Sequence, residues 1–226
     1  MRSAILTASL MLTPTTASMC GGGSSTADSG TELPVEDDGD CTHYEGMDTE
    51  TAPIQRAEAG LPVGASGLQW DSPTDWTRWI AFHGSPGAAA THEGIDWVHD
   101  DSTVLEVDVA TAAAGEVVYV RTGCPESDLF SRNTSLRECG AGWGNHVIIH
   151  HGGNTYTRYA HLRDGQVFAE VGDELTEGDV IGVMGNSGRS ETRHLHFELG
   201  SSVSGFDPCG LAASFDAVHD PALVGL

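Results

Sequence analysis

Residues 166–188, QVFAEVGDELTEGDVIGVMGNSG, contain the pattern that decides the fold of this chain. Short apolar runs alternate with Gly-Asp or Gly-Asn pairs at 172–173, 178–179 and 185–186. Such pairs are typical of tight turns, because glycine tolerates positive φ and the Asp or Asn side chain hydrogen-bonds the nearby backbone. We therefore expect a series of short strands joined by turns in this segment.

Neighbouring segments extend the pattern in both directions. Residues 104–120, VLEVDVATAAAGEVVYV, are rich in strand-forming residues, with Gly115 marking a turn or bulge. Residues 146–162, HVIIHHGGNTYTRYAHL, predict two strands around a His-Gly-Gly-Asn turn. No long window has the 3.6-residue period of a helix, although residues 71–82, DSPTDWTRWIAF, are a candidate for a short one. The sequence predicts a mainly β fold built on an antiparallel sheet.

The composition limits the classes of function. The chain has 226 residues and a formal net charge of −23, which argues against binding nucleic acid because phosphates require a basic surface. All ten cations are arginine, and the chain has no lysine. This absence excludes a biotinyl or lipoyl carrier domain. Residues 171–185 resemble the hairpins of such carriers, but the carriers attach their cofactor to a lysine.

The N-terminus predicts export. Residues 1–19 have the features of a secretory signal peptide, with Arg2 before an apolar, Ser/Thr-rich stretch that is too short to span a membrane. Cys20 and the GGGSS that follows resemble the mature start of a bacterial lipoprotein, although Met19 stands where a small residue is usual. Two interpretations remain open: a cell-envelope lipoprotein with a membrane tether through Cys20, or a freely secreted protein.

Residues 20–52 are predicted to be an acidic, low-complexity linker. They contain nine acidic residues, no cation and no apolar periodicity, so they cannot bury enough surface to fold. The globular domain is expected over residues 53–226.

The cysteines also fit export. Setting Cys20 aside leaves four, which allow three pairings that the sequence does not choose between. Cys124 and Cys139 bracket a polar loop and are the favoured first pair. Cys41 with Cys209 would then be the second.

Histidines in strand-like surroundings indicate a chemical site. Within RHLHFEL, residues 193–199, His194 and His196 are two apart, so in a strand they point to the same side. HEGID, residues 92–96, offers His92 and Asp96, which we expect on a loop or strand edge because Gly94 and the β-branched Ile95 disfavour a helix. On that interpretation Glu93 is incidental.

Five motifs in order resemble the lysostaphin-type (LytM-like) zinc metallopeptidases, which cleave the peptide part of bacterial peptidoglycan. The resemblance covers about residues 90–200 and rests on HEGIDW, GWGNHVIIHHG, TRYAHL, VGDELTEGDVIGVMGNSGRS and RHLHFEL. It implies an antiparallel β domain whose long loops form a zinc-containing groove, and a zinc-dependent endopeptidase acting on peptidoglycan cross-links. The alternative is a non-catalytic relative that binds peptidoglycan or regulates another hydrolase.

The resemblance also implies the site residues. His92, Asp96 and His196 match the metal ligands for one Zn²⁺, and three protein ligands leave a position for water, as catalytic zinc sites require. His161 and His194 match the two catalytic histidines that do not bind metal. We take His194 as the general base and His161 as the stabiliser of developing charge, although the sequence does not separate these roles.

Other features receive weaker interpretations. The family often has Gly-Pro where this chain has Thr192-Arg193, which would alter the groove wall, and the loop between Cys124 and Cys139 would border the groove. Trp143 would either floor the groove or pack in the core. The remaining histidines divide into candidates for contact with the ligand residues (His83, His99), candidates for turn or surface positions (His146, His150, His151), and two without a role (His43, His219).

Overall fold

The computed structural model describes residues 42–45, 55–65, 68, 73–209 and 214–225. These residues belong to one compact unit, residues 36–226. The predicted signal peptide, Cys20, Cys41 and most of the predicted linker lie outside the described residues, so those predictions remain predictions.

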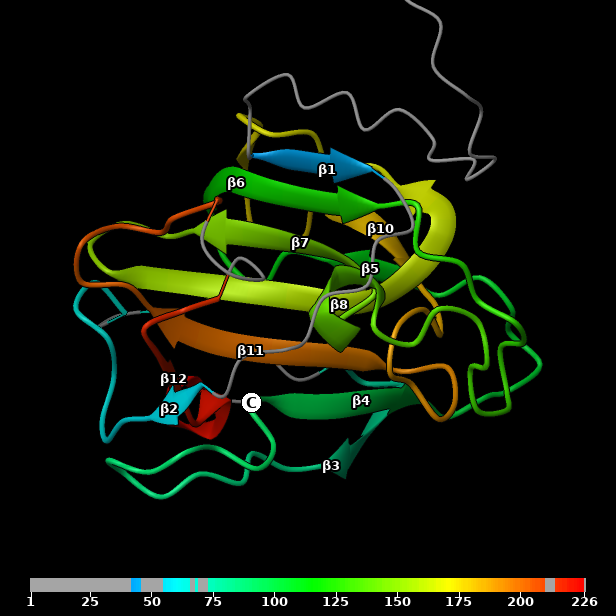
Figure 1. Cartoon of the computed structure of the whole chain (residues 1–226), viewed down its shortest axis with the longest axis horizontal. Helices are drawn as coiled ribbons and strands as arrows, with labels where there is room; N and C mark the ends of the chain where they lie inside the picture. Colours follow the sequence, from blue (N-terminus) through cyan, green and yellow to red (C-terminus); the bar gives the residue numbers. More distant parts are fainter. Residues whose placement is uncertain (1–41, 46–54, 66–67, 69–72, 210–213, 226) are drawn as a thin grey trace, which may run out of the picture. The chain divides into compact units, whose positions relative to one another are not determined.

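The described chain is mostly β-structure (Figure 1). Its strands are β1 (His43–Glu45), β2 (Arg56–Ala57), β3 (Trp76–Ile80), β4 (Ile95–His99), β5 (Asp108–Ala110), β6 (Gly115–Thr122), β7 (Asn145–His150), β8 (Thr155–Val167), β9 (Glu174–Leu175), β10 (Val180–Met184), β11 (Leu195–Ser201) and β12 (Ala217–His219). Two 3-10 helices, η1 (Cys139–Gly142) and η3 (Pro221–Val224), are the helical elements within the described ranges.

The strands form one sheet in the order β1-β6-β7-β8-β11-β12-β2. Figure 1 shows β6, β7, β8 and β11 as four neighbouring arrows across the molecule. Along its far edge β11 pairs with β4 over its first half and with β12 over its second half, and β3 pairs with β4. Only β1–β6 and β12–β2 are parallel among the described pairs, so the predicted antiparallel sheet is confirmed.

Strand β11 separates the core from a polar face. Leu195, Phe197 and Leu199 point to one side, where they belong to the main hydrophobic cluster. That cluster also receives Ile95 from β4 and Tyr159 from β8. The alternate residues of these three strands therefore face the opposite side, where the candidate site lies.

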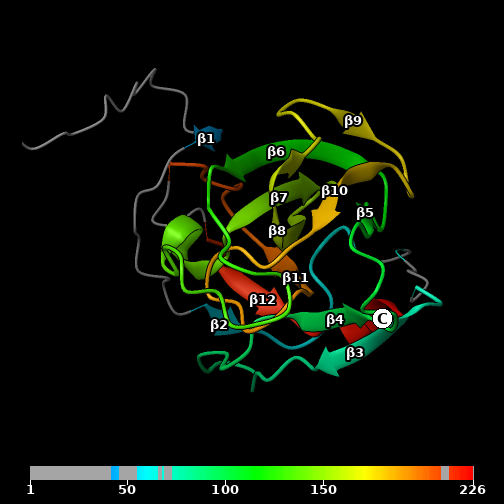
Figure 2. The ribbon, with the colours of Figure 1, turned by 90° about the vertical axis from the view of Figure 1, so that its right-hand side faces the viewer.

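The predicted glycine-turn segment forms as expected. Residues 166–188 contain the end of β8, then β9 and β10, and the glycines at 172 and 178 have φ values of +90° and +89°. Figure 2 shows β9 and β10 on the side of the sheet near β6 and β5. Side chains of Asp173 and Asp179 accept backbone hydrogen bonds from residues three positions earlier, which closes each turn.

The hypothesis of a short helix in residues 71–82 is wrong. Residues 76–80 form β3, which pairs antiparallel with β4 from Trp76 opposite His99 to Ile80 opposite Asp96. Aromatic and β-branched residues fit this half-exposed edge strand better than a helix. As predicted, HEGID is not helical, since His92 forms a bridge with His83 and Ile95 begins β4.

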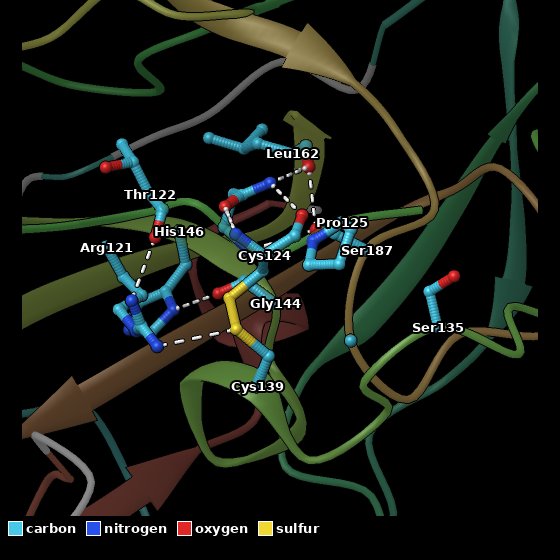
Figure 3. Close-up of a disulfide and its surroundings, with 12 residues drawn as sticks. Arg121, Thr122, Cys124, Pro125, Ser135, Cys139, Gly144, His146, Leu162 and Ser187 are labelled. Atoms are coloured by element: carbon cyan, nitrogen blue, oxygen red, sulfur yellow. Dashed lines mark hydrogen bonds between the residues drawn. A yellow bond between two sulfur atoms is a disulfide. The ribbon is translucent and has the colours of Figure 1, made fainter. Parts of the chain in front are cut away.

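One of the two predicted disulfides is confirmed. Cys124 and Cys139 are bonded, and they close the polar loop between β6 and η1 (Figure 3). Cys209 is also disulfide-bonded, but its partner lies outside the described residues. The pairing of Cys41 with Cys209 therefore remains a prediction.

Within the described part of the chain, no helix has the length and apolar character needed to cross a membrane.

Gly94 is expected to be indispensable to the pairing of β4 with β11. A Cβ at this position would lie 2.1 Å from the carbonyl oxygen of Phe197, which is backbone and cannot rotate away. We expect Gly94→Ala to lower the free energy of unfolding by about 3 kcal/mol or more, measured by urea denaturation.

The matched control is Gly165→Ala. Gly165 has a φ of +69°, but nothing lies within 4 Å of its added Cβ, so this variant should cost only the backbone strain of about 1 kcal/mol. Equal losses in the two variants would contradict the role assigned to Gly94.

Candidate metal centre and catalytic site

Strand register builds the centre of the site. His196 on β11 lies directly opposite Asp96 on β4 and opposite Ala160 on β8. Residues opposite one another in an antiparallel pair project to the same face, so the side chains of Asp96 and His196 meet. Nδ1 of His196 lies 2.8 Å from Oδ1 of Asp96.

His92 enters the same site from the loop before β4. Its Nδ1 donates to the carbonyl oxygen of Ala81 at 2.8 Å, which leaves Nε2 directed at Oδ1 of Asp96, 3.0 Å away. One atom each from His92, Asp96 and His196 thus lie within 4.8 Å of one another. Their rings are close as well, with 5.0 Å between the centroids of His92 and His196.

This donor set fits a zinc ion. Two imidazole nitrogens and one carboxylate oxygen are ordinary zinc ligands, and each histidine already bonds its other nitrogen to a protein oxygen. A second grouping, Glu93 with His196 and Glu198, has the same compactness. Glu198 is a poor ligand, however, because its two oxygens already accept hydrogen bonds from buried side chains.

His161 reaches the site through an irregular backbone. It has a φ of +59°, and the pairing of β7 with β8 shifts register between Asn145 and Val147. Tyr159 and Leu162 both belong to the main core cluster, so the extra residue between them lets Ala160 and His161 both leave the core side. Nδ1 of His161 donates to the carbonyl of Ser187 at 2.7 Å, which leaves Nε2 available.

His194 lies just before β11 and beside His161. The ring centroids of these two histidines are 4.6 Å apart. Nδ1 of His194 is 2.7 Å from the carbonyl oxygen of Thr192, to which it donates, and Nε2 lies 3.7 Å from Oδ1 of Asp96. The edge of Trp79 covers its other side, with 5.6 Å between ring centroids.

Burial sets the charge states of the two histidines outside the donor set. Burial lowers the pKa of His161 well below its ordinary value, and the nearby His194 and His196 lower it further. Burial also lowers the pKa of His194, against the opposing effect of Asp96. Both side chains are therefore neutral near pH 7 and can accept a proton on Nε2.

Two of the ligand candidates, His196 and Asp96, are charged instead of neutral. Burial alone would lower the pKa of His196, but hydrogen bonds to Asp96 and Glu198 outweigh it and raise this pKa to about 10. Burial alone would raise the pKa of Asp96, but hydrogen bonds from His196 and His92 hold it well below its usual range. His196 and Asp96 thus form an ion pair, and a divalent cation bound by both would displace the proton between them.

An open pocket surrounds these groups. Its lining residues come from β3, β4 and the loop before it, η1 and the residue after it, β8, β11 and the segment before it (Trp79, Ile80, His92, Glu93, Asp96, Ala141, Gly142, Trp143, His161, Arg189, Glu191, His194, His196). All five predicted site residues are among them. Glu93, interpreted as incidental, also lines the pocket, and burial raises its pKa.

The disulfide loop supports the pocket from behind. Arg137 donates to the carbonyl of Ser190 and pairs with Glu191, and Glu138 pairs with Arg189. The loop therefore contacts the segment that precedes His194 without lining the pocket itself. Figure 3 shows the disulfide close to Ser187, whose carbonyl holds His161.

Arg193, at the position where the sequence departs from the family pattern, points away from the pocket. It is buried and donates to the carbonyls of Val104 and Asp101, with its guanidinium 4.9 Å from the ring of Phe130. Thr192 contributes its backbone carbonyl to His194. The residues Thr192-Arg193 therefore affect the contacts between loops outside the pocket and do not change the pocket lining.

A buried network below the site was missed by the sequence analysis. His146 was expected at a turn or on the surface, but it is buried and accepts a hydrogen bond from Arg158 on Nε2. Trp143 both lines the pocket and donates to Glu198. The available signal was the period of two, which continues from His194 and His196 to Glu198.

The other histidines lie mainly outside the site. The ring of His83 contacts that of His92, with centroids 6.2 Å apart, as suggested. His99 bonds the carbonyl of Asp101 instead. His150 and His151 bond backbone carbonyls near turns, and His219 bonds Gly60 and Ser201 within the sheet. His43 belongs to β1, and its side chain is outside the description.

A family model described as Peptidase family M23 matches residues 90–208, which include every candidate site residue.

Curated relatives match parts of the chain. Peptidoglycan DD-endopeptidase ShyA of Vibrio cholerae is 43% identical over 56 residues, which are 25% of this chain and 13% of that protein. Peptidoglycan DD-endopeptidase ShyC of the same organism is 38% identical over 134 residues, 57% of this chain and 26% of that protein. DD-carboxypeptidase/endopeptidase Mpg of Neisseria meningitidis is 37% identical over 71 residues, 31% of this chain and 16% of that protein. The chain therefore spans about a quarter or less of these relatives' length.

Solved structures share a more distant likeness. The catalytic domain of lysostaphin from Staphylococcus simulans has a TM-score of 0.44 and 19% identity, covering 66% of this chain and 90% of that one. The catalytic domain of the M23 protein EnpA from Enterococcus faecalis has a TM-score of 0.42 and 22% identity, covering 64% and 92%.

The metal-free protein should lose stability as the pH falls below about 6.5, the ordinary pKa of histidine. Burial lowers the pKa of five histidines in the fold, so below pH 6.5 each binds less proton in the folded than in the unfolded chain (His146, His151, His161, His194, His219). Their stabilisation is present above the unfolded pKa and is lost below it. Each contributes a slope of at most about 1.4 kcal/mol per pH unit between its folded and unfolded pKa.

Urea unfolding between pH 7.5 and 5.5, with a chelator present, measures this slope. A His146→Asn variant, which keeps a donor for the Gly144 carbonyl, should reduce the slope because one of the five contributing histidines is removed. A profile that is flat in the unmodified protein would contradict the neutral, buried state of these histidines.

Proposed function

The chain belongs to peptidase family M23, and on that premise we propose that it is a zinc-dependent endopeptidase that hydrolyses amide bonds in peptidoglycan peptide cross-links. The observation that carries the proposal is the gathering of two kinds of group in one pocket. Three donor atoms of His92, Asp96 and His196 lie within 4.8 Å of one another, and two neutral histidines stand beside them. Hydrolysis of an amide by a metal-activated water uses both kinds.

The donor set would hold the metal. A zinc ion bound there would supply Lewis acidity, which makes water acidic enough to act as a nucleophile near neutral pH. His92 and His196 fix their outer nitrogens on Ala81 and Glu198, so they can each present one nitrogen to the ion without reorienting.

His194 is proposed as the general base. Its Nε2 lies 3.7 Å from the carboxylate oxygen of Asp96, at the border of the donor set, and its Nδ1 is held by Thr192. It would take a proton from the attacking water on Nε2 and then donate that proton to the leaving amine. The low pKa of the buried ring favours this return of the proton.

His161 is proposed to stabilise the charge that develops on the scissile carbonyl. Its ring is 4.6 Å from that of His194 and 5.9 Å from that of His196, so it faces the same space. The hydrogen bond to Ser187 keeps Nδ1 protonated and fixes the ring. Nε2 of the neutral ring would accept the second proton of the attacking water, and the charged ring would then donate a hydrogen bond to the oxyanion. It would pass that proton on to the leaving amine, which departs as an ammonium ion.

The curated relatives support the substrate class. Two of them are named peptidoglycan DD-endopeptidases, which suggests a cross-link between D-amino acids as the bond that this chain cleaves. An exported location would bring the enzyme to this substrate, and the Cys124–Cys139 disulfide is typical of an oxidising compartment. The proposal includes export, with the chain either anchored to the cell envelope through Cys20 or freely secreted.

Cleavage of purified peptidoglycan by the full chain, with zinc added, tests the function. We expect new amino termini, identified by mass spectrometry, from the wild type only. His161→Ala and His194→Ala should each retain one zinc per chain while losing at least about 100-fold in rate, since general acid–base catalysis contributes that much. His92→Ala should lose both zinc and activity.

Two outcomes would overturn parts of the proposal. Bound zinc without cleavage of peptidoglycan from several wall types would favour the non-catalytic, peptidoglycan-binding or hydrolase-regulating relative. Loss of zinc from His161→Ala or His194→Ala would contradict the division between ligands and catalytic histidines.

A further inference from the structure

Glu198 is a fully buried carboxylate with four hydrogen-bond donors around it. Oε1 accepts from Nε2 of His196 at 3.0 Å and from Nε1 of Trp143 at 2.6 Å. Oε2 accepts from Nε of Arg158 at 2.9 Å and from the side-chain amide of Gln55 at 3.3 Å. A carboxylate has about four acceptor positions, so these bonds fix its orientation.

Arg158 supplies the counter-charge from the neighbouring strand. It lies directly opposite Glu198 in the pairing of β8 with β11, and neither side chain is exposed to solvent. Its guanidinium also donates to Nε2 of His146 at 3.0 Å and lies 3.6 Å from the ring centroid of Trp143. The network therefore holds four side chains in place: Glu198, Arg158, His146 and Trp143.

The network decides which nitrogen of His196 faces the donor set. In a neutral imidazole one nitrogen carries the proton and the other accepts. Because Nε2 donates to Glu198, Nδ1 is the nitrogen presented to the metal position, 2.8 Å from Asp96. Without an acceptor at Glu198, the ring would be free to rotate or to change its tautomer.

We propose that Glu198 is a positioning residue for the metal centre, which holds His196 in the ligating orientation and is itself held by Arg158. The inference rests on the proposed function, since it assumes that His196 is a zinc ligand. It adds a residue two positions beyond the histidine pair, on the same face of β11. Trp143 extends the arrangement, because the indole that donates to Glu198 also lines the pocket.

A merely structural role predicts a different result. A buried ion pair can be replaced by apolar side chains of similar size with little change in stability. If Glu198 and Arg158 only fill the interior, replacing both should leave metal binding unaffected. If Glu198 orients His196, metal binding should weaken even when the protein is as stable as before.

The test is the zinc affinity of the full chain, measured by competition with a chromophoric chelator. We expect Glu198→Met combined with Arg158→Met to bind zinc 10–100-fold more weakly, the usual effect of removing the partner of a ligating histidine. Urea unfolding of the metal-free variant shows whether it is folded. Affinity within about threefold of the wild type in the folded double variant would overturn the proposal.

Two further variants keep the test decisive. Glu93→Gln removes a carboxylate that has an oxygen within 4.8 Å of a ring nitrogen of His196 but no hydrogen bond to it among the described contacts, so its zinc affinity should change by no more than a few-fold. An equal loss of zinc affinity in Glu93→Gln would mean that the nearby negative charge, and not the hydrogen bond of Glu198 to His196, accounts for the weaker binding. If the double variant does not fold, Glu198→Gln decides, with an expected loss of about tenfold; affinity within threefold of the wild type overturns the proposal.

The proposed function and this inference can fail separately. Zinc affinity of the wild type and its cleavage of peptidoglycan test the function before any variant is compared. A wild type that binds zinc and cleaves, with variants that bind zinc equally well, would overturn only the role of Glu198.

Discussion

The pairing of β11 with β4 on one side and β8 on the other is the constraint on which this site depends. It sets His196 opposite both Asp96 and Ala160, so two ligand candidates and the approach to His161 are fixed by backbone hydrogen bonds. Because side chains alternate along a strand, a slip of one residue would turn His196 into the core and bring Leu195 or Phe197 to the site. The hydrophobic cluster on the other face opposes that slip. The same strand register thus places the apolar residues in the core and the site residues on the opposite face of the sheet.

The polar face of β11 carries more charge than an interior normally tolerates. Glu198 and Arg158 are both fully buried, and a buried ion is stable only when its hydrogen-bonding groups have partners. Here each member meets several partners, and the pKa of Glu198, which burial would raise, is lowered to about 2 chiefly by Arg158 and then by His196. The same arrangement leaves Nδ1 of His196 directed at the donor set. The hydrogen bonds of Glu198 therefore both fix the side chains below the pocket and orient the ligand candidate His196 within it.

Much of this could be predicted from the sequence, because period and turn chemistry are local. The strands at residues 145–150, 155–167 and 195–201 follow from alternation and from glycine turns, and the shared face of His194 and His196 follows from the period of two. The local pattern did not predict the strand at residues 76–80, because pairing with β4 determines its conformation. The local pattern also did not predict that Arg158 and His146 are buried. A polar side chain can be buried only with a hydrogen-bonding partner, and the partner of Arg158, Glu198, is 40 residues away in the sequence. His161 was found by motif, while the positive φ that turns it toward the site was not visible in sequence.

The ligand candidates Asp96 and His196 are separated by 100 residues, and Gln55 meets Glu198 across 143. Contacts of such long range form late in folding, since the entropy of closing large loops must be overcome before they contribute stability. A partly folded chain in which β4 and β11 are not yet paired would therefore lack the centre. Assembly of the donor set and completion of the sheet would thus be a single event in the folding of this chain.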